Sequence, residues 1–479
     1  MRAQDTLLLS FLDFLNSVVR GNSLTRSDFS SCVGMNSESG LSHTGIGLSA
    51  LTAVLVGLGH RSVGYASYCT DHGDELQVVG LAEPNSERLA RYAAKWGIPS
   101  ENCFTSAAEL AAAVKFADVA INGTMDDIHV ETTIPLLEAG YDVLLEKPIA
   151  RNAVELRELA DVAERTGRKV VICHVLRHAP FYVAIKEKIT AGEIGDIMHI
   201  HTTENVSYHH MAVGFVRGKW NRRAVNPMLL AKCCHDLDLL CWFKSGTEPT
   251  KVASFGGHHF FTEENAPAGS GTHCHDCEIE RDCQYSALRH HIENGWWPFY
   301  AFAGEPSYEA GAGGDGDGDE NEIIAVADQK REFLESSDYS RCVWKCDNDV
   351  VDRQSIIVEF EDGSVATHDM VTNSARATRR LQITGTKGEI EGDMISGRIV
   401  IRKPAATQGE EWSEEVYSTL EGGDMHGGGD LRLVADFVKV VRGEVPSLST
   451  TELSDSINSH LIAFAADEAM LNSKVIELN

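Results

Sequence analysis

Residues 50–145 repeat one pattern, in which a short apolar segment ends at a turn and is followed by a segment with helical spacing. Strands are predicted at residues 52–56, 76–81, 118–123 and 142–145, and helices at residues 85–96 and 128–139. Short apolar strands that alternate with helices are typical of a parallel sheet with helices on both faces. The chain is therefore predicted to have an α/β fold that begins with a doubly wound parallel sheet.

The turn after the first strand, Gly57-Leu58-Gly59, is typical of a dinucleotide-binding site. Gly57 would allow the tight turn, and Gly59 would let the backbone approach a pyrophosphate at the start of the next helix. His60 and Arg61, which follow the turn, complete the predicted contacts in this segment. Ser62 stands where the usual pattern has a third glycine, and glycine turns are common, so the pattern alone is weak support.

Glu83 strengthens the prediction because it follows the second strand at the spacing that dinucleotide sites use. A carboxylate at this strand end can accept hydrogen bonds from both ribose hydroxyls, and it would repel a 2′-phosphate. NAD is therefore favoured over NADP. The alternative is that Glu83 only caps the helix of residues 85–96.

Polar side chains follow the third and fourth strands. Strand ends of a parallel sheet meet at one edge, so Thr124 is predicted to lie near Glu146 and Lys147. His129 begins the helix after Thr124 and could reach the nicotinamide ribose; a solvent-facing histidine is the alternative. We expect a cofactor site at this edge, with chemistry beside it.

The composition restricts the classes of partner that this chain is expected to bind. The 479 residues carry 42 Lys and Arg against 71 Asp and Glu, a formal net charge of -29. Such a surface repels nucleic acid and anionic lipid, and no apolar run is long enough to span a bilayer. Single cysteines in apolar settings are typical of a reducing compartment, so a cytoplasmic location is expected. The residues that show this usage are Cys32, Cys69, Cys103, Cys173 and Cys241.

Several of these elements resemble the glucose-fructose oxidoreductase / inositol dehydrogenase (Gfo/Idh/MocA) family, over roughly residues 50–479. The most specific is Glu146-Lys147-Pro148, supported by the glycine turn and by Thr124 with His129. Later elements agree: Arg177 after a strand at residues 169–174, Gly192-Glu193-Ile194-Gly195 before a strand at 197–203, and Gly385-Thr386-Lys387-Gly388.

Three parts are expected, of which the resemblance implies the second and the third. Residues 1–49 would be a poorly ordered leader and linker, residues 50–175 a Rossmann NAD-binding domain, and residues 176–479 a substrate and oligomerisation domain. The last would be an α/β domain with a large open, mostly antiparallel sheet, whose open face commonly forms dimers or tetramers. We therefore expect a homodimer or homotetramer. The family's substrates are usually sugars, sugar acids or cyclitols.

The resemblance also assigns catalytic roles. Lys147 would touch the nicotinamide ribose and the reacting hydroxyl, where an ammonium stabilises the developing alkoxide. Residues 228–243 have helical spacing, and His235 on that helix matches the family's general acid/base. Typical members have an aspartate four residues before this histidine, whereas this chain has Ala231 followed by Lys232. Lys232 would hold a substrate oxygen or lower the pKa of His235.

Other polar residues are candidates for the substrate site. Asp238 lies one helical turn after His235 and could orient its ring, and Arg177 follows a strand end. His210 belongs to a loop rich in aromatic, His and Arg residues at 204–223, which suits either a polyhydroxylated ligand or an oligomer interface. His426 could contact a sugar from the glycine-rich segment 425–430, in which a helix cap by Asp430 is the alternative.

An insertion at about residues 257–350 carries clustered cysteines. Cys274 and Cys277 have the spacing that lets two thiolates meet one ion, and Cys283 and Cys342 could complete a structural zinc site. His273, His275 or Cys346 could substitute, and unliganded thiols or a disulfide are the alternatives. The acidic stretch at residues 313–322 is interpreted as a disordered loop, since its ligand spacing does not match a calcium loop.

These expectations combine into an NAD-dependent oxidoreductase that oxidises a secondary hydroxyl of a sugar, sugar acid or cyclitol. The loss of the usual aspartate at Ala231 leaves two alternatives open. One is an NAD-dependent glycosidase that acts by transient oxidation and elimination. The other is a non-catalytic NAD-binding sensor or scaffold.

Overall fold

The computed structural model describes residues 49–296, 298–302, 320–405, 407, 409–419 and 425–478. Residues 1–48 of the expected leader and linker lie outside these ranges, and so do residues 313–319 of the expected acidic loop. Among the described helices, none is long and apolar enough to cross a membrane.

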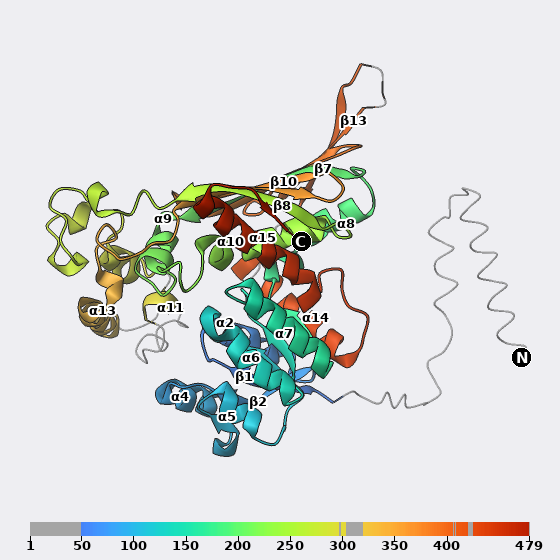
Figure 1. The fold of residues 1–479 in the computed structure, drawn as a ribbon. Helices are drawn as coiled ribbons and strands as arrows, with labels where there is room; N and C mark the ends of the chain where they lie inside the picture. Colours follow the sequence, from blue (N-terminus) through green and yellow to red (C-terminus); the bar gives the residue numbers. More distant parts are fainter. Residues whose placement is uncertain are drawn as a thin grey trace, which may run out of the picture. The chain divides into compact units, whose positions relative to one another are not determined.

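The first sheet has six parallel strands in the order β3-β2-β1-β4-β5-β6 (Figure 1). The strands are β1 Leu51–Val56, β2 Leu76–Ala82, β3 Cys103–Phe104, β4 Val119–Asn122, β5 Asp142–Leu145 and β6 Val170–Ile172. The helices of this part are α2 His60–Ala66, α3 Tyr68–Asp71, α4 Ser86–Trp96, α5 Ala107–Ala112, α6 His129–Glu138 and α7 Ala153–Thr166. This strand order is that of a Rossmann fold and confirms the predicted doubly wound sheet.

Local sequence explains these elements well. Residues 53–56 of β1 are at most 1% exposed, which fits a central strand covered on both faces. Helix α4 begins where the side chain of Asn85 accepts from the N–H of Arg88, and it ends at Gly97 in the left-handed region, φ 67°. The strand order reverses between β1 and β4, so their carboxyl ends border the position where such folds bind a dinucleotide.

The second sheet has nine strands in the order β14-β13-β12-β11-β7-β10-β9-β8-β15. They are β7 Ile197–Ser207, β8 Pro249–Gly257, β9 Arg353–Phe360, β10 Val365–Ser374, β11 Thr378–Gly385, β12 Glu389–Asp393, β13 Arg398–Pro404, β14 Trp412–Ser418 and β15 Ile476–Glu477. Strands β7 and β10 pair in parallel, and the other pairs are antiparallel. This mixed sheet is the large, mostly antiparallel sheet that the resemblance implied.

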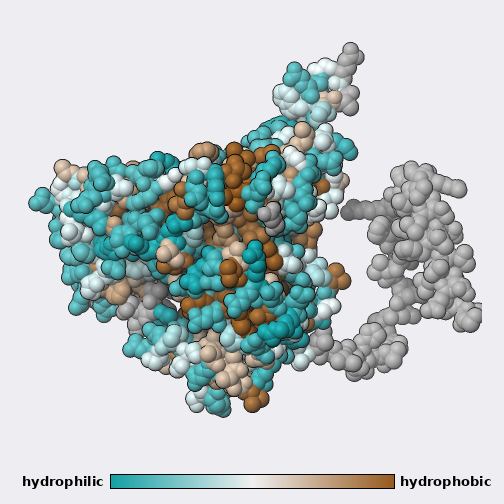
Figure 2. All heavy atoms as spheres, viewed as in Figure 1, coloured by the Kyte–Doolittle hydropathy of each residue, from teal (hydrophilic) through white to brown (hydrophobic). Residues whose placement is uncertain are grey.

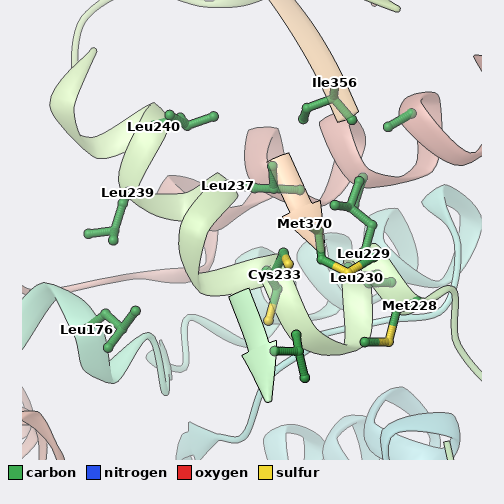
Figure 3. Packing of buried hydrophobic residues seen from close by; sticks show 14 of the residues in the cluster. Leu176, Met228, Leu229, Leu230, Cys233, Leu237, Leu239, Leu240, Ile356 and Met370 are labelled. Atoms are coloured by element: carbon green, nitrogen blue, oxygen red, sulfur yellow. The ribbon is translucent and has the colours of Figure 1, made fainter. Parts of the chain in front are cut away.

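Helices α10 Met228–Phe243 and α15 Leu453–Asn472 lie along one face of this sheet (Figure 1). Helix α10 is buried almost all round, and Leu237 packs with Ile356 and Met370 of the sheet in the largest apolar cluster (Figure 3). Because α10 carries His235, this packing fixes the position of the predicted acid/base. Helix α14, Gly429–Arg442, instead packs its apolar face into a cluster with the first sheet.

The other face of the second sheet lacks such a cover in the described residues. Met198, Phe255, Ile357 and Val371 project from β7, β8, β9 and β10 and are between 41% and 76% exposed. Figure 2 shows a hydrophobic patch along the upper edge of this sheet, within a mainly hydrophilic surface.

The insertion connects β8 to β9, which are neighbouring antiparallel strands. Its first and last flanking residues, Gly257 and Arg353, are partners in the sheet. Helices α11 Pro298–Ala301 and α13 Glu320–Ser336 lie within it.

Candidate active site

The glycine turn packs closely against the end of β4 at Gly57 and leaves open space at Gly59. Gly57 has φ +75°, and a Cβ on it would lie 3.0 Å from the Cα of Thr124, so a side chain here would disturb the adjoining strand end. A Cβ on Gly59 would meet only the carbonyl of Gly123, at 4.0 Å. The backbone at Gly59 is therefore accessible to a ligand, as a pyrophosphate site requires.

Glu83 is 3% exposed at the end of β2 and faces this turn. Its carboxylate accepts from the N–H of Leu58 at 2.8 Å and from the N–H of Asn85 at 3.0 Å. Arg88 donates to it at 3.3 Å. Glu83 thus joins the turn to the segment before α4, whose cap is Asn85 and not Glu83.

Lys147 and Glu146 lie at the end of β5, as predicted. The ammonium of Lys147 donates to the carbonyl of Ala231 on α10 at 3.1 Å, so it crosses from the first sheet to the helix that carries His235. Burial by itself lowers the pKa of Lys147, but the neighbouring Cys234 and Glu146 outweigh this effect and raise it above its usual value. Lys147 is therefore a cation at neutral pH.

Glu146 belongs to a buried polar network. It accepts from Arg61 and from the hydroxyl of Tyr65, both at 2.7 Å, and Arg61 also pairs with Asp430 of α14. Burial would raise the pKa of Glu146, but Arg61 and Lys147 hold it below its usual value. Arg61 was predicted to contact the cofactor; in the structure, its guanidinium instead joins β5 to α14.

His235 is 4% exposed, and its Nδ1 has no hydrogen-bond partner among the described residues. Its ring lies 5.6 Å from that of His174 and 5.8 Å from that of His426, between centroids. Burial, with the charge of Lys147 next in size, lowers the pKa of His235 well below its usual value. His235 is therefore neutral at neutral pH and able to accept a proton.

His426, a predicted ligand contact, lies beside His235 in the structure, and its role at a ligand stays a prediction. It has φ 63°, and its Nδ1 lies 3.0 Å from the carboxylate of Asp430. The backbone conformation turns the chain sharply before α14 and directs the imidazole toward His235. Asp430 thus pairs with both His426 and Arg61, and no side-chain cap of α14 is formed.

Lys232 has different partners from those predicted. Its ammonium pairs with Glu204 of β7 at 3.0 Å, and Glu204 also pairs with Arg379 of β11 at 2.8 Å. Arg379 in turn contacts Asp236 at 3.0 Å. Lys232 is not among the main groups that set the pKa of His235, whose largest charged neighbour is Lys147. The predicted effect of Lys232 on His235 is therefore replaced by that of Lys147.

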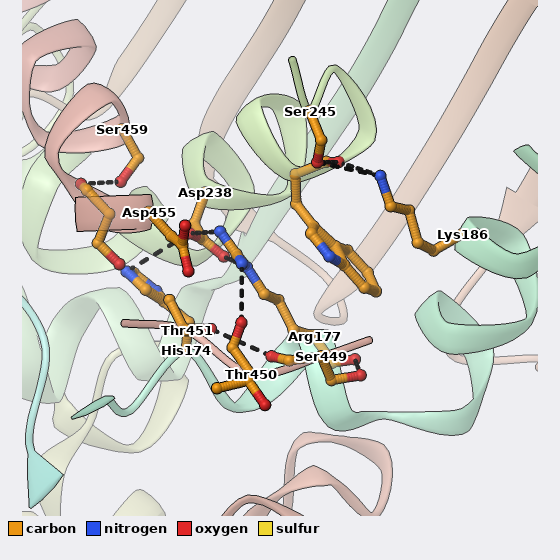
Figure 4. Close-up of polar contacts among 12 residues, drawn as sticks. His174, Arg177, Lys186, Asp238, Ser245, Ser449, Thr450, Thr451, Asp455 and Ser459 are labelled. Atoms are coloured by element: carbon orange, nitrogen blue, oxygen red, sulfur yellow. Dashed lines mark hydrogen bonds and ion pairs between the residues drawn. The ribbon is translucent and has the colours of Figure 1, made fainter. Parts of the chain in front are cut away.

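Arg177 and Asp238 pair with each other rather than facing a ligand. Arg177 donates from Nε and Nη2 to the two carboxylate oxygens of Asp238, both at 2.7 Å, and the side chains are 4% and 1% exposed (Figure 4). The Nε2 of His174 lies 3.7 Å from Asp238, so the carboxylate neighbours His174 and not His235. Arg177 and Asp238 thus form a buried ion pair, and their roles as substrate contacts stay predictions.

Two further predicted contacts have protein partners in the structure. The ring nitrogens of His129 lie 2.6 Å from the carbonyl of Pro148 and 3.1 Å from that of Thr124, and the residue is 1% exposed. It is thus not solvent-facing. The ring of His210 stacks on that of Tyr300 in the insertion, with centroids 5.8 Å apart. Their roles at cofactor and substrate stay predictions.

Burial also affects His60, the other residue predicted beside the glycine turn. It lowers the pKa of His60 to about 4, with Arg61 adding to the effect. His60 is therefore uncharged at neutral pH and would act near a cofactor as a neutral group.

Sequence reasoning missed Glu204, Arg379 and Asp430. Glu204 has the same strand parity as Ile200, Thr202 and Val206, which are buried. A glutamate on the buried side of a strand was therefore a signal of a buried ion pair. Its partner Arg379 is too far away in sequence for any local pattern to reveal.

Comparison with known proteins agrees with this geometry. Residues 51–174 match the family model described as "Oxidoreductase family, NAD-binding Rossmann fold", and residues 186–478 match "Oxidoreductase family, C-terminal alpha/beta domain". The chain belongs to the Gfo/Idh/MocA oxidoreductase family. As a member of this family it is an NAD(P)-dependent dehydrogenase with a nicotinamide cofactor, which the geometry at Gly57, Gly59 and Glu83 fits.

Similar proteins include YteT from Bacillus subtilis (strain 168), 24% identical over 386 residues, or 75% of this chain and 81% of that protein. A solved Gfo/Idh/MocA-like fold is that of an oxidoreductase from Agrobacterium radiobacter in complex with NAD+, L-tartaric acid and magnesium: TM-score 0.61, 12% identity, covering 90% of this chain and 98% of the other. Myo-inositol 2-dehydrogenase from Lactobacillus plantarum has TM-score 0.58 and 16% identity, covering 90% and 100%. These likenesses show the fold.

Proposed function

We propose that this dehydrogenase oxidises a secondary hydroxyl of a sugar, sugar acid or cyclitol with NAD as hydride acceptor. The observation that carries the proposal is the contact of Lys147 with the carbonyl of Ala231, one helical turn before His235. It joins a cation at the cofactor edge of the first sheet to a neutral imidazole on α10. The resemblance to a myo-inositol dehydrogenase fold supports a polyol as substrate.

The protein's residues divide the work of the reaction. A bound nicotinamide would supply the hydride acceptor for oxidation of the carbinol carbon. Lys147 would hold the substrate hydroxyl and stabilise the negative charge that develops on its oxygen. His235 would accept the hydroxyl proton, since burial and Lys147 keep the ring neutral. Glu146 stabilises the ammonium and is itself held by Arg61 and Tyr65.

The preference for NAD rests on Glu83. Its carboxylate lies beside the glycine turn and would repel a 2′-phosphate while accepting from the ribose hydroxyls. The ion pair with Arg88 partly offsets this charge. We therefore infer that NAD is preferred and that the preference depends on Glu83.

A specific contact favours a second candidate, an NAD-dependent glycosidase. His426, paired with Asp430, lies beside His235 and would supply a second acid/base group. Net cleavage by transient oxidation, elimination and re-reduction needs such a group to protonate the leaving oxygen. Oxidation alone needs only one proton acceptor.

The open face of the second sheet supports a homodimer or homotetramer. Exposed apolar residues on four adjacent strands, from Met198 to Val371, form a surface that a second copy could cover.

The deciding experiment follows NADH absorbance with purified protein, NAD and a panel of sugars, sugar acids and inositols. Lys147→Ala is the test variant. Lys115→Ala is the control, because Lys115 also donates to a carbonyl but is exposed and remote from this edge. NADH formation that Lys147→Ala alone abolishes supports the dehydrogenase. Cleavage of aryl glycosides that requires NAD but yields no net NADH would replace it with the glycosidase.

A further inference from the structure

The insertion brings together three cysteines of one short segment and a fourth that is distant from them in sequence. Cys274, Cys277, Cys283 and Cys342 all line one cavity of about 20 Å³. A bridge pairs His273 with Arg341, and the N–H of Cys342 donates to the carbonyl of Thr272 at 2.8 Å. The backbone pairing thus carries Cys342 to the segment that holds the other three.

Two of the sulfur atoms accept hydrogen bonds from the backbone. The N–H of Gly271 donates to Sγ of Cys277 at 3.3 Å, and that of Ala287 donates to Sγ of Cys274 at 3.4 Å. These two backbone N–H groups hold the sulfur atoms of Cys277 and Cys274 in place. All four cysteines are free of disulfide bonds.

A buried arginine on the same cavity lacks a negative partner. Arg217 is 3% exposed, donates to the carbonyls of Arg341 and Tyr285, and reaches Sγ of Cys274 at 3.5 Å. Its Nη1 has no hydrogen-bond partner among the described residues, and its other guanidinium nitrogens contact two carbonyls and a thiol. A buried cation is costly unless a negative charge offsets it.

We propose that Cys274, Cys277, Cys283 and Cys342 bind one Zn²⁺ in a tetrahedral structural centre. Zn²⁺ replaces the four thiol protons, so four Zn–S bonds form and four protons leave. The four thiolates and the ion together carry two negative charges, which offset the buried charge of Arg217. The centre fastens the two ends of the insertion to each other beside Arg217.

The geometry selects among the possible ligands and ions. Cys346 does not line the cavity, and its sulfur contacts the carbonyl of Cys342 at 3.3 Å. Glu280 lines it, but its carboxylate accepts from the hydroxyl of Ser286. No three of the four sulfurs lie within 4.8 Å of one another, so the ion draws them inward on binding.

A second group of possible metal ligands has ligand atoms that lie closer together, but its charge does not suit a metal ion. Cys233, Asp236 and His368 place theirs within 4.8 Å of one another. Asp236, however, pairs with Arg379 at 3.0 Å, so its negative charge is already offset. This group therefore serves as the rival site in the test.

The test measures zinc in the full-length protein after expression with added zinc and purification without chelators. We expect about one zinc per chain, and its loss in both Cys277→Ser and Cys342→Ser. Cys346→Ser and Cys233→Ser are the controls and should retain it. Protein without zinc that also fails to bind added Zn²⁺, or cysteine variants that retain it, would overturn the proposal.

A second measurement uses the unaltered protein, so its result does not depend on whether the variants fold. Replacement of the bound ion by Co²⁺ should yield the visible bands of a tetrahedral site and strong thiolate-to-cobalt charge transfer. Cobalt spectra without charge transfer, or a disulfide between any of the four cysteines in the isolated protein, would exclude the centre. Removal of zinc by a chelator should also accelerate proteolysis within residues 258–352 before the first sheet is cut.

Discussion

The ammonium of Lys147 donates to the backbone carbonyl of Ala231 at 3.1 Å. The resemblance places a carboxylate at position 231 in typical members of the family, whereas this chain supplies a carbonyl one residue before Lys232. The contact holds the ammonium of Lys147 against α10, where the nearby carboxylates of Glu146 and Asp126 favour its charged form. Its charge is then available both to a substrate oxygen and to the imidazole of His235.

Lys147→Met should lower kcat by about 10²–10³-fold, because stabilisation of the developing alkoxide is lost. Steady-state kinetics with a substrate identified from the panel checks this. Lys115→Met removes an exposed lysine that also donates to a carbonyl, and it should keep kcat within about twofold of the unaltered enzyme. Equal losses in the two variants would exclude a specific role for Lys147.

The pH dependence of kcat/KM should reflect the lowered pKa of His235. The base is active when neutral, and its pKa lies well below 6.5, so the rate should fall only below pH 6.5 and not as pH rises above it. His235→Asn should lower kcat by about 10²–10⁴-fold and abolish this acid limb. His72→Asn, at a side chain that is 46% exposed, should leave the profile unchanged. An acid limb above pH 7 would contradict the assignment.

Glu83→Ser should move cofactor preference toward NADP. It removes a charge-assisted hydrogen bond, so kcat/KM for NAD should fall by about 10–150-fold. Arg88, released from its ion pair, would then be free to meet a 2′-phosphate and improve NADP. Comparison of kcat/KM for the two cofactors tests this, with the exposed Glu87→Gln as control. Unchanged preference would mean that Glu83 serves only to join the glycine turn to the segment before α4.

Asp238→Asn should destabilise the protein by about 3–5 kcal/mol, because it leaves the buried guanidinium of Arg177 without its partner. Chemical denaturation monitored by tryptophan fluorescence measures the change. Glu138→Gln breaks the exposed pair with Arg165, whose side chains are 50% and 62% exposed, and should cost about 0–1 kcal/mol. A small effect of Asp238→Asn would argue that Asp238 is held for ligand binding instead.

Local patterns sufficed for much of the fold. Five of the six strands of the first sheet, all except the two-residue β3, lie at predicted strand positions, and α10 covers the residues predicted to be helical, 228–243. Such elements are encoded by adjacent residues. The family comparison then confirmed the NAD-binding fold that the glycine turn and Glu146-Lys147-Pro148 predicted.

The side-chain pairs of the site were harder to predict from the sequence, because they join segments that are far apart along the chain. Arg61 and Asp430 are 369 residues apart, and Arg177 and Asp238 are 61 apart, so no spacing rule links them. Each of these residues is of a type that often contacts ligands. Only the fold shows that it pairs with another side chain of the protein. His235 was identified because a family resemblance, and not periodicity, marked it.

The insertion leaves the second sheet at Gly257 and returns at its cross-strand partner Arg353. Loops closed at such a point can change in length at little entropic cost and without altering strand order. Natural variation could therefore enlarge, shorten or replace this segment while the dehydrogenase body stays intact. The dehydrogenase reaction and the inserted segment can therefore change independently of each other in evolution.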